Sequence, residues 1–121
     1  MTTLEDQTAA TLAAVARFNI AFDNHDVDGV MAAMTEDCVF ESTGPAPDGP
    51  RYMGAAAVRQ FWEKFFGANP NARFTPEEQF AAADRCVVRW RYDWGDGHVR
   101  GVDIFRVRDG LVAEKLSYVK G

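Results

Sequence analysis

The sequence predicts an α+β fold, in which three N-terminal helices pack on a strongly curved antiparallel sheet that forms a cone with one internal pocket. Two observations predict it. Apolar residues recur at helical spacing as far as about residue 66, and further along the chain they alternate with a period of two. Because the helices come first and a meander of strands comes last, the order is not that of βαβ units.

The predicted helices are recognised by their apolar faces. The first covers about residues 5–23 and carries the stripe Leu12, Val15, Phe18, Asn19 and Phe22. Asp26 is placed to cap a short second helix that continues through Met34. The third helix opens at Gly54 and runs to about Phe66, and its apolar face consists of Val58, Phe61, Trp62 and Phe65.

Strands are expected on both sides of the third helix. Residues 38–42 read as a short first strand, and residues 43–53 read as a loop at the rim of the pocket because they hold three prolines and two glycines. Residues 86–94 alternate clearly between apolar and polar. Tight turns at 96–97 and 108–110 then separate two further strands, at 99–107 and 111–119.

Length and charge exclude several classes of protein. The 121 residues suit one domain, 1–121, and the net charge of -5 disfavours binding to nucleic acid. No apolar stretch approaches the roughly 20 residues that span a bilayer. The start of the chain lacks the features of a signal peptide, so we expect a cytoplasmic protein. Cys38 and Cys86 read as two buried thiols.

Neither a metal nor a cofactor is expected. His25 and His98 are not clustered with carboxylates, so a metal site is not indicated. The glycines at 44, 49 and 54 lie among prolines and precede no lysine, which excludes a phosphate-binding loop of the usual kind.

Asp103 is the main candidate for a functional residue. Alternation places it on the same strand face as Phe105 and Val107, which suit a core. One interpretation is that Asp103 faces solvent or pairs with Arg89 or Arg91 on the adjacent strand. The other is that it is a pocket carboxylic acid, removed from water and able to donate or exchange a proton.

The opposite face of the same strands is also apolar. Val102, Ile104, Leu111 and Ala113 lie on it, and an antiparallel sheet with two apolar faces suggests that the outer face meets another subunit. A homodimer formed through the outer face is therefore expected.

Two further candidates depend on strand register. In the last strand, either Val112, Glu114, Leu116 and Tyr118 face inward, or Lys115, Ser117 and Val119 do. In the first case Tyr118 supplies a pocket hydroxyl; the adjacent Glu114 and Lys115 read more readily as a solvated pair. Glu41 becomes a candidate catalytic base if a bulge turns it inward.

Four segments in order resemble the SnoaL-like branch of the nuclear transport factor two-like superfamily: residues 21–30, 36–40, 51–61 and 105–112. The ketosteroid isomerases of this superfamily use three pocket groups: an acid on a late strand, a tyrosine on the first helix and a carboxylate base on the first strand. By this resemblance the acid corresponds to Asp103, the tyrosine to Phe18 and the base to Ser42. Phenylalanine cannot donate a hydrogen bond and serine is a poor base, so the resemblance does not imply steroid isomerisation by the usual route.

The polyketide cyclases of the SnoaL-like branch require only a pocket acid or base and an apolar cavity. The resemblance therefore implies an isomerase, cyclase or hydrolase that uses acid/base chemistry on a hydrophobic carbonyl compound. Asp103 would be the proton donor or exchanger, and Tyr118 or Glu41 a helper. The expected ligand-binding walls are Phe18, Phe40, Ser42, Phe61, Trp62, Trp90 and Tyr92. The alternative is a non-catalytic ligand-binding or dimerisation domain of the same fold.

Overall fold

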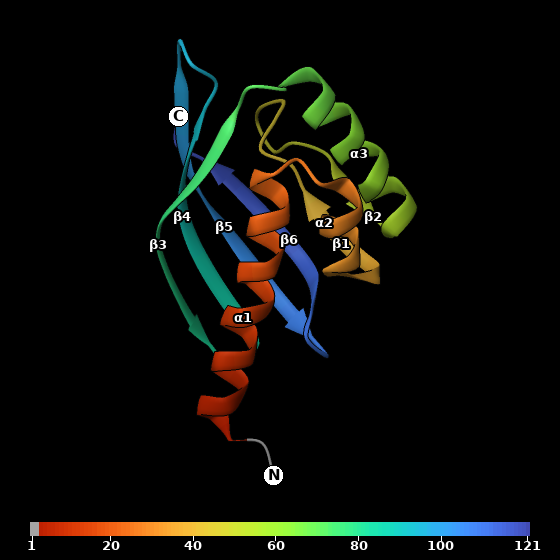
Figure 1. Ribbon diagram of the computed structural model, residues 1–121, viewed down its shortest axis with the longest axis vertical. Coiled ribbons are helices and arrows are strands. Elements are labelled where there is room, and N and C mark those ends of the chain that lie inside the picture. Colours follow the sequence, from red (N-terminus) through yellow and green to blue (C-terminus); the bar gives the residue numbers. More distant parts are fainter. Residues whose placement is uncertain (1–2) are drawn as a thin grey trace.

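The computed structural model describes residues 3–121 and confirms the predicted fold class. Helices pack against one side of a single curved, six-stranded sheet (Figure 1). The elements in chain order are α1 (Leu4–Asp23), α2 (Val27–Ala32), β1 (Met34–Glu41), β2 (Arg51–Met53), α3 (Ala55–Ala68), β3 (Arg73–Ala82), β4 (Arg85–Asp93), β5 (His98–Arg108) and β6 (Leu111–Val119).

The sheet has the strand order β2-β1-β6-β5-β4-β3. All neighbouring strands are antiparallel except β1 and β6, which are parallel, so the sheet is mixed where the sequence predicted only antiparallel pairing. The register shifts between Pro76 and Glu78 on β3 and between Arg106 and Val107 on β5. Such bulges bend strands, which fits the curvature of the sheet around α1 (Figure 1).

Three strand predictions need correction. Residues 51–53, predicted as loop, form β2, because Tyr52 pairs with Phe40 of β1. β1 begins at Met34, four residues before the expected start, and shortens α2 accordingly. β3 was not predicted because it is an edge strand whose middle is polar and exposed, so it lacks the alternation of a half-buried strand.

Local hydrogen bonds fix the ends of the first two helices. Thr3 and Asp6 form a capping box at the start of α1. At its other end, Asp23 accepts two hydrogen bonds from the Arg73 guanidinium and one from the backbone N–H of Phe74, which joins α1 to the start of β3. Asp26 caps α2 as predicted, accepting a hydrogen bond from the backbone N–H of Gly29 at 3.0 Å.

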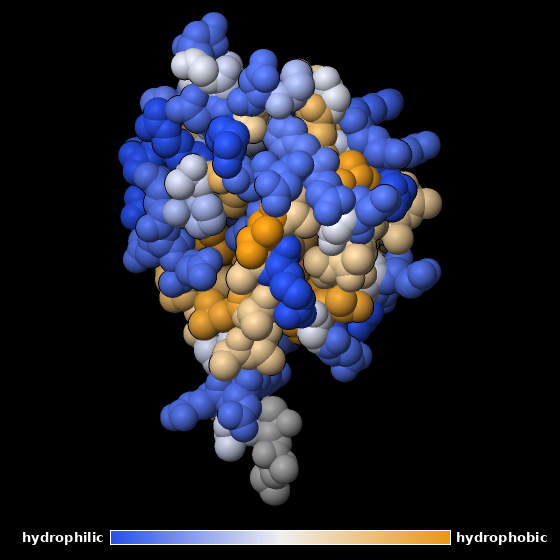
Figure 2. All heavy atoms as spheres, in the orientation of Figure 1, coloured by the Kyte–Doolittle hydropathy of each residue, from blue (hydrophilic) through white to orange (hydrophobic). Residues whose placement is uncertain are grey.

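The core lies between α1, α3 and the concave face of the sheet. Phe18 is fully buried and packs edge-on against Phe105 of β5 and Trp62 of α3. Cys38 and Cys86 are buried free thiols, as predicted. On the side of the molecule seen in Figure 2, hydrophobic atoms gather along the middle, where Figure 1 places α1, and hydrophilic side chains surround them. Within residues 3–121, no helix is long and apolar enough to cross a membrane.

Candidate functional site

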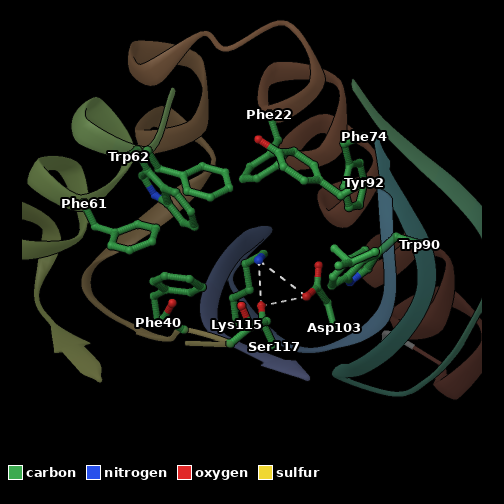
Figure 3. A pocket seen from close by; sticks show the side chains of 14 residues that line it. Phe22, Phe40, Phe61, Trp62, Phe74, Trp90, Tyr92, Asp103, Lys115 and Ser117 are labelled. Carbon is green, nitrogen blue, oxygen red and sulfur yellow. Dashed lines mark hydrogen bonds and ion pairs between the residues drawn. The ribbon is translucent and has the colours of Figure 1, made fainter. Parts of the chain in front are cut away.

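A cavity of about 180 Å³ opens between the concave face of the sheet and the helices. Aromatic rings form most of its wall, and the polar side chains that reach it come mainly from β5 and β6 (Figure 3). Its lining consists of Phe22, Phe40, Ser42, Thr43, Phe61, Trp62, Phe65, Phe74, Trp90, Tyr92, Val99, Asp103, Lys115 and Ser117.

Three of these side chains form a buried hydrogen-bonded chain. Asp103 of β5 lies opposite Ser117 of β6 in the sheet, and Lys115 lies two residues before Ser117 on the same face. Lys115 Nζ donates to Ser117 Oγ at 2.8 Å, and Ser117 Oγ donates to Asp103 Oδ1 at 2.7 Å. Lys115 Nζ also lies 3.4 Å from Asp103 Oδ1, so the lysine and the aspartate form an ion pair (Figure 3).

The amino group of Lys115 is surrounded by aromatic rings on its other side. Its nitrogen lies 4.8 Å from the ring centroid of Phe40 and 5.4 Å from those of Phe22 and Trp62. These ring faces partly replace water around the cation. Burial lowers the pKa of Lys115 below the usual value for lysine, and the nearby Asp103 carboxylate opposes that shift without cancelling it.

Several buried polar atoms of the residues that line the cavity have no hydrogen-bond partner among residues 3–121. They are Asp103 Oδ2 and three potential donors on the rings, Trp62 Nε1, Trp90 Nε1 and Tyr92 Oη. Burial raises the pKa of Tyr92 to about 12, so its hydroxyl remains protonated near neutral pH. Since unpaired buried polar groups are costly, a ligand that supplies both an acceptor and a donor would be stabilised here.

Most of the predicted wall residues line the cavity: Phe40, Ser42, Phe61, Trp62, Trp90 and Tyr92. Phe18 does not. It lies behind the wall, where its ring centroid is 5.5 Å from that of Phe105 and 6.4 Å from that of Trp62. Its role is therefore to support Trp62, because α1 presents Phe18 to the core and Phe22 to the cavity.

Tyr118 and Glu41 are not in the cavity. Tyr118 is 51% exposed, because the register of β6 turns Lys115 and Ser117 inward and Tyr118 outward. Glu41 pairs with Arg51 at 3.3 Å on the exposed side of β1 and β2, so no bulge turns it inward. These placements correct both candidates as pocket groups.

The expected partners of Asp103 and Lys115 are also corrected. Arg89 pairs with Glu78 and Arg91 with Asp93, so neither arginine neutralises Asp103. The predicted solvated pair of Glu114 and Lys115 does not form, since adjacent strand residues point to opposite faces. Glu114 instead lies 3.6 Å from Arg85. Lys115 is thus the functional candidate that the sequence analysis missed.

No group of three or more His, Cys, Asp or Glu side chains within residues 3–121 is arranged to hold a metal ion. The polar groups of the residues that line the cavity are one carboxylate, one amine, hydroxyl groups and indole N–H groups. Such a set can hold a carbonyl oxygen and exchange a proton with a bound molecule.

The fold and the cavity define a small α+β protein with an aromatic-lined pocket between its helices and the concave face of its sheet. A model of the SnoaL-like domain matches residues 15–115, and the chain belongs to the SnoaL-like family. No curated protein matches the chain.

Solved structures give the same fold. A protein of unknown function from Mesorhizobium loti, described as nuclear transport factor two-like, is 44% identical, with a TM-score of 0.85 over 96% of this chain and 95% of that one. A candidate ketosteroid isomerase from Kribbella flavida is 20% identical, with a TM-score of 0.81 over 94% and 80%. A candidate polyketide cyclase from Sinorhizobium meliloti is 22% identical, with a TM-score of 0.75 over 86% and 92%.

Proposed function

We propose that this protein is an enzyme that binds a small hydrophobic carbonyl compound and moves a proton to or from the carbon next to the carbonyl group. The observation that supports this function best is the buried chain of Asp103, Ser117 and Lys115 on the wall of an otherwise aromatic cavity. Perturbed, paired titratable groups inside an apolar pocket are typical of catalytic sites.

The size of the cavity limits the ligand. A cavity of about 180 Å³ is only a little larger than the roughly 150 Å³ apolar cavity known to hold benzene. The part of a ligand inside the cavity is therefore one ring or a short chain, and the rest of a larger molecule such as a steroid would extend out of the open side. The missing tyrosine and carboxylate, and not the size of the cavity, argue against steroid isomerisation.

Each polar group has a chemical role in this proposal. Asp103 Oδ2 has no hydrogen-bond partner among residues 3–121, and in this proposal it accepts the proton from the carbon and later returns it. As that proton leaves, negative charge develops on the carbonyl oxygen. The Lys115 ammonium and the N–H and O–H donors of the surrounding rings stabilise this charge in a site with little water.

Hydrogen–deuterium exchange tests the function without knowledge of the natural substrate. Cyclohexanone, acetophenone and phenylacetaldehyde are incubated with the protein in deuterated water, and loss of their α-proton signals is followed by NMR. We expect the wild type to accelerate exchange for at least one of them. Asp103→Asn should slow this exchange by about 100-fold or more, with ligand affinity changed only a few-fold.

Glu41→Gln is the matched control, because Glu41 is a carboxylate of the same sheet that lies outside the cavity, on β1. It should exchange at the wild-type rate. If the wild type binds these compounds but accelerates no exchange, the protein is a ligand-binding domain. Equal exchange in wild type and Asp103→Asn would remove Asp103 from the chemistry.

A further inference from the structure

Lys115 differs from the other two lysines of the chain. Lys64 and Lys120 are exposed, whereas Lys115 is 5% exposed and its amino group reaches the cavity. A primary amine in an apolar pocket can serve as a counter-ion and can also act as a nucleophile toward carbonyl groups.

We propose that Lys115 is a covalent binding site, whose amino group condenses with an aldehyde or ketone in the cavity to form an imine. The inference rests on the proposed function for the carbonyl class of the ligand. It adds a bond between protein and ligand that simple acid/base chemistry does not need.

The hydrogen-bonded chain gives the lysine a route to its nucleophilic form. A proton can pass from Lys115 Nζ to Ser117 Oγ while the hydroxyl proton of Ser117 passes to Asp103 Oδ1, over separations of 2.8 and 2.7 Å. This exchange leaves a neutral amine and a neutral carboxylic acid, with no change in the net charge of the pair. Burial favours the neutral amine, since it lowers the pKa of Lys115.

The condensation balances with these groups alone. The lone pair of Nζ forms a bond to the carbonyl carbon, the carbonyl electron pair moves onto oxygen, and that oxygen takes a proton from Asp103. Asp103 then recovers a proton from the nitrogen through Ser117. In the second stage Asp103 returns it to the hydroxyl group, which leaves as water while the nitrogen lone pair forms the C=N bond. The product is a protonated imine beside an Asp103 carboxylate.

The surroundings suit that product. The positive charge of the protonated imine lies where the lysine ammonium lay, 4.8 Å from the ring centroid of Phe40 and within reach of Asp103. The protonated imine draws electrons from the neighbouring carbon more strongly than the free carbonyl does. Asp103 Oδ2, unpaired within the described part of the chain, is then available as the base for the α-proton.

Reductive trapping tests the covalent site. The intact protein is incubated with benzaldehyde and sodium borohydride, which adds hydride to an imine carbon and leaves a stable benzylamine. We expect one benzyl group per chain by intact mass spectrometry. Peptide mapping should place it on Lys115, with labelling at least 10-fold above that of Lys64 or Lys120, and denatured protein should lose this selectivity. Absence of the adduct, or equal labelling of the three lysines, overturns the proposal.

Two variants separate the covalent role from an electrostatic one. Lys115→Arg keeps a positive charge beside Asp103 but cannot form an imine, and Lys115→Met serves if the larger guanidinium does not fit. Both should abolish trapping, whereas Lys120→Arg should trap as the wild type does. α-Proton exchange of cyclohexanone should be lost in Lys115→Arg; retained exchange would make Lys115 a counter-ion only.

The two proposals fail in different ways. Benzaldehyde has no α-proton, so its trapping does not depend on proton transfer at carbon. Wild-type exchange of cyclohexanone without trapping of benzaldehyde refutes the imine and leaves the acid/base function. Trapping at Lys115 without exchange of any ketone or aldehyde refutes the acid/base function and leaves the covalent site.

Discussion

At the scale of single residues, the cavity depends on two opposite charges that lie 3.4 Å apart and almost out of contact with water. Asp103 is 1% exposed and Lys115 is 5% exposed. Removing one member of such a pair leaves the other charge buried without compensation, which typically costs about 3–5 kcal/mol. Function and stability are thus coupled at this position.

A single and a double variant test this coupling. We expect Lys115→Met to lower the free energy of unfolding by about 3 kcal/mol, because Asp103 then loses its cation. The double variant Asp103→Leu/Lys115→Met should regain at least half of that loss, since an apolar pair of similar size suits the aromatic surroundings. Urea denaturation followed by circular dichroism provides both values. A double variant less stable than Lys115→Met would contradict a stabilising coupling between the two charges.

The sequence predicts which side chains face the cavity only where the alternation of a strand is regular. Asp103 follows from the apolar Phe105 and Val107, which share its strand face and are buried. The inward orientation of Lys115 cannot be predicted in this way. The register shift between Arg106 and Val107 leaves both Val112 and Ala113 buried on β6. With two consecutive apolar residues buried, the alternation of β6 is ambiguous, and the inward face is known only when the pairing with β5 is known.

At the scale of elements, one glycine on β5 makes room for part of the cavity wall. Gly101 pairs with Trp90 of β4, and a Cβ at Gly101 would lie 2.6 Å from a carbon of the Trp90 ring and 2.2 Å from the backbone oxygen of Tyr118. The Trp90 ring therefore packs against Gly101, where any larger residue would force the ring or the backbone to move. The glycine connects the backbone of the sheet to the shape of the cavity.

Gly101→Ala should displace Trp90 and lower stability by about 1–3 kcal/mol, because the backbone oxygen of Tyr118 cannot move aside cheaply. Tryptophan fluorescence and affinity for cyclohexanone should both change. Gly67→Ala is the matched control: its added Cβ meets nothing within 4 Å in α3, so it should raise stability by about 0.5–1 kcal/mol and leave affinity unchanged. Wild-type affinity and fluorescence in Gly101→Ala would argue against the proposed packing role of the glycine.

Element prediction succeeds where the pattern is amphipathic and fails at the sheet edges. α1, α3 and β4 carry regular apolar periods and lie close to their predicted bounds. β2 and β3 are the two edge strands, and neither has a buried apolar face along its length. Their pairing is determined by the neighbouring strand and not by their own composition, so periodicity gives no signal for them.

At the scale of the whole molecule, the outer face of the sheet carries a transverse apolar row. Phe80, Val87, Ile104 and Leu116 are directly paired neighbours across β3, β4, β5 and β6. Phe80 is 58% exposed, and the other three are partly exposed. Arg85, Arg106 and Glu114 flank this row on one side, so both signs of charge are present beside it.

We propose that a second copy of the chain covers this apolar row. A two-fold axis brings each copy's row against the other, and the mixed charges beside it can pair across the axis. Size-exclusion chromatography with light scattering should give a dimer for the wild type and a monomer for Ile104→Glu. Ile20→Glu, a substitution at an exposed apolar residue of α1, should remain dimeric. A monomeric wild type at micromolar concentration would refute the interface.

NMR of the ε-methylene groups of the three lysines tests most directly whether Lys115 and Asp103 face a cavity that binds a carbonyl compound. We expect the Lys115 signal to titrate at lower pH than an exposed lysine, because burial lowers its pKa, and at still lower pH in Asp103→Asn, where the opposing carboxylate is gone. Acetophenone should shift this signal and leave those of Lys64 and Lys120 unchanged. A Lys115 signal that titrates like an exposed lysine and does not respond to acetophenone would contradict the account.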